Sequence, residues 1–458
     1  MASMLGMATA GQAMSVLSDE ELSTVDGQAL LNLHNSFSSD QGINFHKLSI
    51  QALMELNVNI KTLQLGCGGV NNSLKMGCDI DISNIALSGL NPGIDGLGNP
   101  LFGQVSRPAT SAEITNPFIE FAIKGDSAAT REVVGFRLGA ENIIGLLTLG
   151  TENTENPTDG IRSFSGYMKM ASTQGESLTK AATFGNSPDQ SIQGQIDVNL
   201  SILGGQKQEI FTSRPGHEGN NGITVPAMRV NFNMPETVVS GQRINKAVVS
   251  GIRSTISSIP LASGGDMTNV IGSPNWGSDQ LYVDFNPLVF GTVGTHAYFK
   301  MLPGSSLDNL NLNITFEQAL SMIHNIPLNG TGGYLSLQSQ PVKWGDSDIA
   351  DTAQTGWWLS FKDPIQLGYL KTQDEVDISY VLPQVASAIS HFLLLPENII
   401  PVSFGEAIGA VLSVPVEKKL NIDVGPYTTA TPATLTLQDK ILQNQNVVPN
   451  CFGGHKFC

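Results

Sequence analysis

Apolar and polar residues alternate in two segments of residues 53–90, on either side of a loop rich in glycine and asparagine. Apolar residues occupy every second position from Leu56 to Ile60 and again from Ile80 to Ile82. This is the two-residue period of a half-buried strand. The phase changes once in each segment, which indicates a bulge or a place where both faces are covered. The pattern predicts a hairpin.

The same alternation recurs to the C-terminus. It is present in residues 116–150, and a polar, turn-rich stretch at 151–160 follows as a candidate linker or long loop. Strict alternation then continues in four further runs, at 192–202, 228–234, 281–285 and 310–316. The pattern predicts a mainly β fold, an elongated antiparallel β-sheet or sandwich-like architecture with a few short amphipathic helices.

Four segments have helical signals. Residues 17–27 and 315–326 each begin with a capping-box pattern, in which Ser or Thr precedes Glu or Gln by three positions. Residues 383–395 and 403–413 place apolar side chains on one helical face. No apolar run reaches the roughly 18 residues of a membrane-spanning helix.

These signals divide the chain into four parts. Residues 1–13 are small and apolar with small-x-Ala cleavage patterns, and are expected to be a signal-peptide remnant. Residues 14–160 form an N-terminal β region with the hairpin. Residues 161–305 form a central β region, and 306–458 a C-terminal β region with helices.

The four cysteines form two local pairs, Cys67 with Cys78 and Cys451 with Cys458. An even number of cysteines in an exported chain favours disulfides, although four cysteines allow three connectivities. We expect the two local bonds, one at the hairpin tip and one in a C-terminal loop. Neither pair has the C-x-x-C spacing of a zinc site, so no metal and no cofactor are expected.

Charge excludes one class of partner. Charged residues are only 14% of the chain and the net charge is -16, without any basic cluster. Proteins that bind nucleic acid need clustered Lys and Arg to track phosphates, so a nucleic-acid partner is not expected. The signal remnant, the disulfides and the polar uncharged surface predict an exported protein, extracellular or at the outer-membrane surface.

Several motifs together resemble a known family. They are LSDEELSTVDGQALLNL, LQLGCGGVNN, CDIDISNIALSGL, NPFIEFAIK with a nearby TREVVGFRLGAE, and the closing NCFGGHKFC. In combination they are similar to the pilus-assembly or Fil-type (FilA-like) surface proteins of Gram-negative bacteria. The resemblance covers about the first third of the chain and its tail. It implies an exported, β-rich surface or fibre component, and it transfers no catalytic residue.

Catalytic and metal motifs are absent from the sequence, so no catalytic residue is assigned. Asp346, Asp348 and Asp351 could supply oxygen ligands to calcium, but the spacing lacks the glycine and the terminal glutamate of an EF-hand loop. Trp344, Trp357 and Trp358 are candidate glycan-binding residues, because aromatic rings stack on sugars. Adjacent tryptophans in a strand point to opposite faces, however, and core packing is the alternative.

The sequence therefore favours a non-enzymatic surface protein, a structural or assembly component of an extracellular fibre or pilus. Its expected partners are other fibre or surface subunits, including copies of itself, joined by strand addition at a sheet edge. One alternative is a glycan-binding adhesin that uses the tryptophans. Another is an outer-membrane β-barrel, with outer-membrane association, although the interior helices count against it. A secreted hydrolase is a further alternative, since β scaffolds carry many chemistries.

Overall fold

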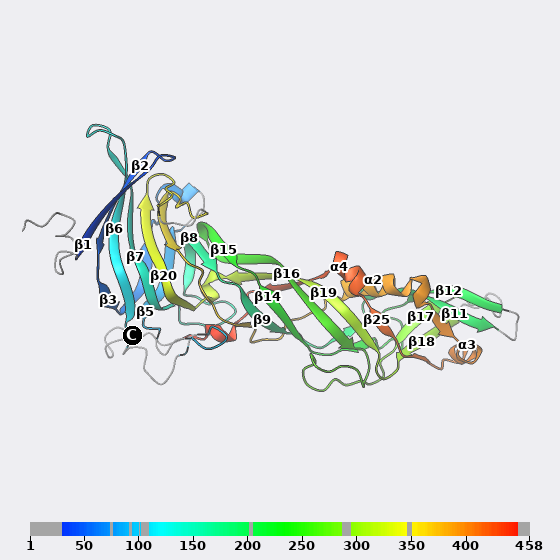
Figure 1. Ribbon diagram of the computed structural model, residues 1–458. Coiled ribbons are helices and arrows are strands. Elements are labelled where there is room, and N and C mark those ends of the chain that lie inside the picture. The colour runs from blue at the N-terminus through cyan, green and yellow to red at the C-terminus, as the bar shows by residue number, and fades with distance from the viewer. Residues whose placement is uncertain are drawn as a thin grey trace, which may run out of the picture.

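The computed structural model describes residues 30–73, 77–90, 94–99, 101, 110–200, 205–285, 295–345 and 350–447. The expected signal remnant at 1–13, the helix at 17–27 and the Cys451–Cys458 loop lie outside these residues. The described chain is mainly β, as its alternation predicts, and the molecule is elongated (Figure 1). The larger sheets are mixed rather than purely antiparallel, because several pairs, such as β19 with β26, run parallel.

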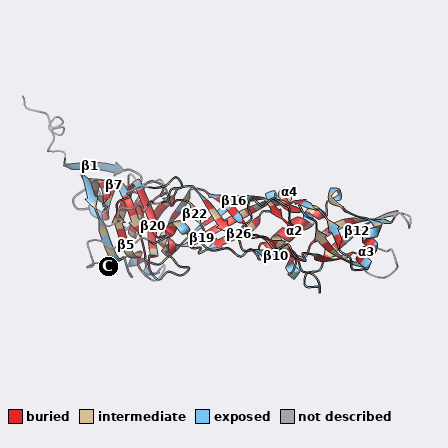
Figure 2. Ribbon diagram, turned by 90° about the horizontal axis from the view of Figure 1, so that it is seen from below, coloured by how far each residue is buried: buried red, intermediate tan, exposed pale blue. Residues whose placement is uncertain are grey.

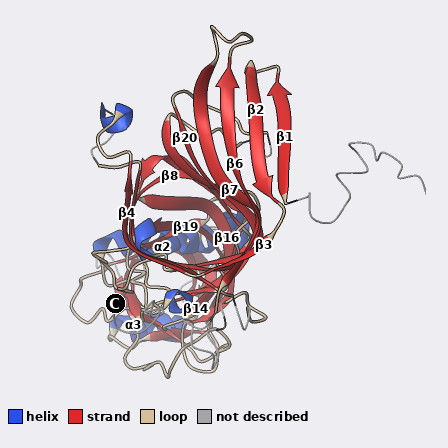
Figure 3. Cartoon of the chain, turned by 90° about the vertical axis from the view of Figure 1, so that its left-hand side faces the viewer, coloured by secondary structure: helices blue, strands red, loops and turns tan. Residues whose placement is uncertain are grey.

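An 11-stranded sheet occupies one end of the molecule (Figure 1). Its main order is β1-β2-β6-β7-β20-β21-β8-β5-β4, while β15 pairs with β8 and β3 pairs with β6. Figure 3 shows how strongly this sheet curves between β4 and β1. The strands are β1 (Leu31–Ser38), β2 (Ile43–Ile50), β3 (Leu53–Leu56), β4 (Val58–Leu65), β5 (Ile80–Ser88), β6 (Ala112–Lys124), β7 (Glu132–Thr148), β8 (Ile161–Met170), β15 (Thr237–Ile244), β20 (Asn325–Gln338) and β21 (Gly356–Phe361).

Part of this sheet closes on itself. The last residues of β7 pair with the last residues of β5, while β7 also pairs with β20. Strand β20 continues to β21, β21 to β8, and β8 back to β5. Five strands therefore form a closed ring of backbone pairings, and β6, β2 and β1 extend from β7 as an open wing.

The middle of the molecule contains two smaller sheets. One has the order β14-β9-β22, and in the other β19 lies between β16 on one side and β25 and β26 on the other. Figure 1 shows the long strands β16 and β19 running between the two ends. The strands are β9 (Thr173–Leu178), β14 (Arg229–Met234), β22 (Leu370–Lys371), β16 (Lys246–Pro260), β19 (Ser306–Ala319), β25 (Asn421–Asp423) and β26 (Ala433–Gln438).

The other end carries a six-stranded sheet in the order β23-β11-β12-β17-β18-β24, and a two-stranded sheet lies nearby in the chain. These strands are β23 (Ile400–Val402), β11 (Gln193–Leu200), β12 (Gly205–Ser213), β17 (Leu281–Phe285), β18 (Thr295–Met301), β24 (Val416–Lys418), β10 (Ala182–Phe184) and β13 (Ile223–Val225). The described helices are α2 (Leu382–Leu393), α3 (Phe404–Val411) and α4 (Gly425–Ala430), with short 3-10 turns η1 (Val70–Ser73), η3 (Pro188–Gln190), η4 (Leu320–Met322), η5 (Pro396–Asn398) and η6 (Gln443–Gln445).

The predicted hairpin at 53–90 is confirmed. Strands β4 and β5 pair antiparallel, with Val58 opposite Leu87 and Leu65 opposite Ile80. The phase change in the second segment coincides with Asn84, which has a left-handed backbone with φ of 51°. Asparagine is one of the few residues that tolerate this conformation. The side chains on either side of it thereby change faces without a shift of the register between β4 and β5.

Two of the expected helices are confirmed and one is wrong. Helices α2 and α3 match residues 383–395 and 403–413, and Ser403 with Glu406 forms the capping box of α3. Residues 315–326 instead form the end of β19, the turn η4 and the start of β20. The reason is that β19 is a central strand, paired with β16 on one side and β26 on the other. Its two-residue burial period outweighs a local capping pattern.

The predicted boundaries at 160/161 and 305/306 do not separate the sheets. The 11-stranded sheet takes β8 and β15 from the expected central region and β20 and β21 from the expected C-terminal region. The larger of two hydrophobic core clusters runs from Ile80 and Ile82 in β5 through β14 and β19 to α2. Figure 2 shows buried residues along the length of the molecule, whereas β1 is exposed. Among the described helices none has the length and hydropathy needed to cross a bilayer.

His324 lies buried where the ring of strands meets the C-terminal segment. Its Nδ1 is 2.8 Å from the Leu149 carbonyl oxygen, and its backbone N–H donates to Gln445 Oε1 at 2.8 Å. Burial lowers the pKa of His324, although the Leu149 carbonyl and the carboxylate of Asp159 oppose that effect. The folded protein therefore holds His324 neutral at a pH where an unfolded histidine takes up a proton.

This histidine predicts a pH dependence of stability. Below about pH 6.5, the ordinary pKa of histidine, the unfolded chain binds a proton that the folded chain does not bind. We expect the free energy of unfolding to fall as the pH decreases from that value toward the lowered folded pKa. Urea unfolding between pH 5 and pH 7.5 measures this slope. The variant His324→Asn keeps a donor for the Leu149 carbonyl and should lose the part of this pH dependence that His324 causes. An unchanged slope in the variant would show that His324 is not its source.

Candidate functional site

Strands β1, β2, β6, β7 and β20 place apolar side chains in register on one face of the 11-stranded sheet. Directly opposed residues of an antiparallel pair point to the same face. The register aligns one such row across all five strands, formed by Leu33, Leu48, Ile119, Leu138 and Leu335. In the next row, Phe121 and Phe136 are opposed, with ring centroids 5.5 Å apart.

Most of these side chains are exposed to solvent. Their exposed fractions run from 40% at Leu138 to 66% at Leu33. Single exposed hydrophobic residues are ordinary, but contiguous ones mark interaction sites. We call the exposed set the apolar sheet face; it consists of Leu31, Leu33, Phe37, Leu48, Ile50, Ile119, Phe121, Leu138 and Leu337.

The opposite face of the same strands buries charge. Glu120 and Arg137 are opposed in β6 and β7, and both are buried. The Arg137 Nε donates to Glu120 Oε2 at 2.9 Å, and Nη2 also contacts that oxygen. In the sequence, Glu120 lies between Ile119 and Phe121. Arg137 lies between Phe136 and Leu138. The buried face of β6 is otherwise apolar, with Phe118 and Ala122 on either side of Glu120, so one ion pair is buried while hydrophobic side chains on the other face stay exposed.

Aromatic rings enclose this ion pair. The Arg137 guanidinium carbon lies 4.6 Å from the ring centroid of Tyr334, 4.7 Å from Trp344 and 5.2 Å from Phe118. Rings at these distances attract a cation through their negative faces. Trp344 comes from the segment after β20, so this segment covers the charged face and leaves the apolar sheet face open.

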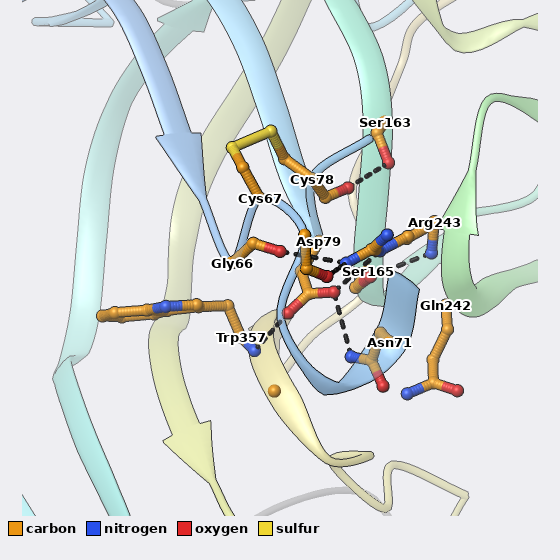
Figure 4. A network of polar contacts seen from close by, with 12 residues as sticks. Gly66, Cys67, Asn71, Cys78, Asp79, Ser163, Ser165, Gln242, Arg243 and Trp357 are labelled. Atoms are coloured by element: carbon orange, nitrogen blue, oxygen red, sulfur yellow. Dashed lines mark hydrogen bonds and ion pairs between the residues drawn. A yellow bond between two sulfur atoms is a disulfide. The ribbon is translucent and has the colours of Figure 1, made fainter. Parts of the chain in front are cut away.

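The predicted Cys67–Cys78 disulfide is present at the tip of the β4–β5 hairpin (Figure 4). A second buried ion pair adjoins it, with Arg243 Nε 2.9 Å from Asp79 Oδ1. The Arg243 Nη2 donates to the carbonyl oxygens of Gly66 and Gly68, each at 2.9 Å. The loop closed by the disulfide is thereby fastened to β15.

The Asp79 carboxylate joins further segments (Figure 4). It accepts hydrogen bonds from Asn71 Nδ2 at 2.9 Å and from the Trp357 backbone N–H at 3.1 Å. Gly66 and Gly356 both have positive φ, and a Cβ on either would lie within 2.4 Å of Asp79 Oδ2. The pair thus holds the hairpin tip, β15 and β21 together. It needs glycine at positions 66 and 356, where the backbone comes close to the Asp79 carboxylate. No part of it is accessible enough to act as a binding site.

The candidate glycan-binding tryptophans do not form a platform. Trp344 and Trp358 are both buried, within one core cluster on the charged side of the sheet. Trp357, half-buried, points to the other face and packs against the main core. The assignment of Trp344 and Trp358 to an exposed glycan site is therefore wrong, because a buried ring offers no face to a sugar.

The remaining candidates are three aspartates and the two C-terminal cysteines. Asp346 and Asp348 lie outside the described residues, as do Cys451 and Cys458. Asp351 is buried and accepts a hydrogen bond from Trp358 Nε1 at 2.9 Å, which anchors the indole. Within the described residues, no group of His, Cys, Asp or Glu is placed to hold a metal ion.

The apolar sheet face itself is the feature that sequence analysis missed. Alternation in residues 116–150 identified the strands but not which face is covered. The sequence does contain a signal for this face. Glu120 and Arg137 have opposite charges, and each is flanked by apolar residues in one of two consecutive strands. Comparison with protein-family models, curated proteins and solved structures found no match for this chain.

The Asp79–Arg243 pair predicts a large loss of stability on neutralisation. Asp79→Asn keeps the shape of the side chain but removes the carboxylate from a buried guanidinium, which typically costs about 3–5 kcal/mol. Urea unfolding measures the change. The exposed turn variant Asp126→Asn is the matched control and should stay within about 0.5 kcal/mol of the wild type. Equal effects of the two substitutions would contradict the role of the pair.

The Glu120–Arg137 pair predicts strong coupling between its two members. Glu120→Leu alone should destabilise by about 3–5 kcal/mol, because Arg137 stays buried without its carboxylate. The double variant Glu120→Leu/Arg137→Met removes both charges and should recover most of that loss. A double-mutant cycle by urea unfolding gives the coupling energy. Purely additive losses would show that the two ions do not depend on each other.

Proposed function

We propose that this protein is a non-enzymatic, exported structural or assembly component of an extracellular fibre. In this proposal, neighbouring subunits add a strand at the free edge of β1 and cover the apolar sheet face. The observation that carries the proposal is the arrangement of β6 and β7, which bury an ion pair on one face and expose a row of hydrophobic side chains on the other. Contiguous exposed hydrophobic side chains of this kind mark a surface that interacts with a partner.

The edge strand supports this mode of assembly. Within the described residues, β1 pairs only with β2, so its other edge is open. Natural edge strands are usually protected by charged residues, proline or bulges. β1 is eight residues long, with the sequence LNLHNSFS, and has none of these devices. An added strand would gain main-chain hydrogen bonds and continue the apolar rows of the sheet.

The remaining features are consistent with a fibre outside the cell. Disulfides persist in oxidising compartments, and Cys67–Cys78 is closed in this fold. An elongated molecule with the edge strand at one end can join neighbours in a line, and identical contacts repeated without closure generate filaments. The partner proposed for the edge is another copy of this chain.

Substitution on β1 tests the proposed contact. Leu33→Lys places a charge in the exposed row of the apolar sheet face, and should weaken self-association by about tenfold or more. Stability should change by less than about 0.5 kcal/mol, because Leu33 is exposed. Light scattering over a concentration series measures the association. Ile210→Lys in β12 is the matched control, since Ile210 is exposed to a similar extent at the far end of the molecule.

The cellular role is tested on the native bacterium. Immunogold electron microscopy with an antibody against residues 160–300 should label filaments in the wild type and in the Ile210→Lys strain. Filaments should be lost from the Leu33→Lys strain and from a deletion strain. Label confined to the cytoplasm, or filaments unchanged by Leu33→Lys, would contradict the proposal.

A further inference from the structure

A pocket of about 380 Å³ lies in the middle of the molecule, between strands β14 and β16. Figure 1 shows these strands next to each other. β14 is the last strand of its three-stranded sheet and β16 is at an edge of its own sheet. All residues of both strands are described, and no ladder joins the two edges. The Ser254 hydroxyl donates to the Asn231 carbonyl oxygen at 2.5 Å and bridges them at one point.

The pocket lining is polar and rich in amides. Its side chains include Gln174, Asn231, Asn233, Arg253, Thr255 and Tyr369. Asparagine and glutamine each offer donors and acceptors, and threonine does so through one hydroxyl. Sugar hydroxyls also donate and accept, so these side chains match a ligand with many hydroxyl groups. Tyr369 is half-buried and contributes an aromatic ring beside them.

The three-stranded sheet on one side of the pocket carries a net positive charge, although the chain as a whole is acidic. The chain has a net charge of -16. Strands β9, β14 and β22, which form the sheet on one side of the pocket, contain Arg229, Lys371 and one carboxylate, Glu176. Glu176 lies near both cations, 3.9 Å from Arg229 Nε and 3.1 Å from Lys371 Nζ. Arg253 adds a positive charge in the lining itself, and the described lining residues include no Asp or Glu.

Arg253 is positioned to bind an anion. It is exposed on β16 within the pocket lining, and no described acidic side chain forms an ion pair with it. A guanidinium binds a carboxylate through two parallel hydrogen bonds, which is the geometry that favours arginine at such sites. The amides therefore select hydroxyls and Arg253 selects a carboxylate.

From this geometry we propose that the pocket between β14 and β16 binds an acidic saccharide, a chain of sugars that carry carboxylates. Its volume lies in the range of small-ligand sites. The site lies on strands that are separate from β1 and the apolar sheet face, so this inference does not depend on the fibre proposal. The tryptophans expected to bind glycans take no part in it.

Calorimetric titration of the purified chain tests this inference. The probes are tetragalacturonate and its fully methyl-esterified, neutral form, at pH 7 and low ionic strength. We expect the acidic tetramer to bind about tenfold more tightly than the ester, because only it pairs with Arg253. Arg253→Gln should lower the affinity for the acid to that for the ester. Asn233→Ala should lower the affinity for both tetramers, since it removes a side chain that contacts sugar hydroxyls.

The control is Arg131→Gln, which removes an exposed arginine at the turn before β7 and should leave both affinities unchanged. Circular dichroism and urea unfolding of each variant establish that it is folded. The proposal is overturned if the wild type binds neither tetramer at millimolar concentration. It is also overturned if Arg253→Gln has no effect, or if Arg131→Gln lowers the affinity as much as Arg253→Gln.

Discussion

The ion pair between Glu120 and Arg137 determines the orientation of the largest sheet. The two residues are paired across β6 and β7 and are buried, and aromatic rings surround the guanidinium. A slip of one residue between the strands would separate them and leave each ion buried alone, which is costly. Because side chains alternate along a strand, burying these ions forces Ile119, Phe121 and Leu138 to the outside. The exposed apolar surface is thus the outer face of strands whose other face buries an ion pair.

The second buried pair has a different role. Asp79 and Arg243 lie far apart in sequence, and around them meet the disulfide loop, β15 and the backbone at Trp357. The disulfide closes a loop that is local in the chain, whereas the ion pair attaches that loop to the remainder of the sheet. One pair therefore sets which face is buried, and the other sets where the hairpin is anchored.

Local pattern was sufficient for much of the secondary structure. Alternation identified the strands around Ile80, Val198, Val230 and Leu312, and the hairpin with its disulfide followed from the spacing of two cysteines. Signals at 383–395 and 403–413 located two helices because their apolar stripes and a capping box agree. The segment at 315–326 failed because pairing on both sides of β19 is a long-range property, absent from any short window.

The functional surfaces were much less accessible to sequence reasoning. Alternation gives two faces to a strand but does not say which one the fold will cover, and the segment that covers the charged face follows β20, about 200 residues later in the chain. The pocket between β14 and β16 gathers Gln174, Asn233 and Arg253 from three strands and Tyr369 from the segment before β22, and none of these segments carries a recognisable motif. For the tryptophans, the sequence left core packing and glycan binding open, because clustering in sequence says nothing about burial.

The closed ring of five strands has a consequence for the order in which the protein can form. Strand β7 ends at Thr148, but its partner β20 begins only at Asn325, and β21 must follow before the ring is complete. During synthesis, the edge of β7 that pairs with β20 therefore lacks its backbone hydrogen-bond partners until more than half of the chain has been made. Contacts of such long sequence separation form slowly and leave sheet edges open to wrong partners. Folding of the ring is thus completed only by β20 and β21, which are made late. A chain truncated before β20 would keep an open sheet edge and would aggregate rather than form a smaller stable domain.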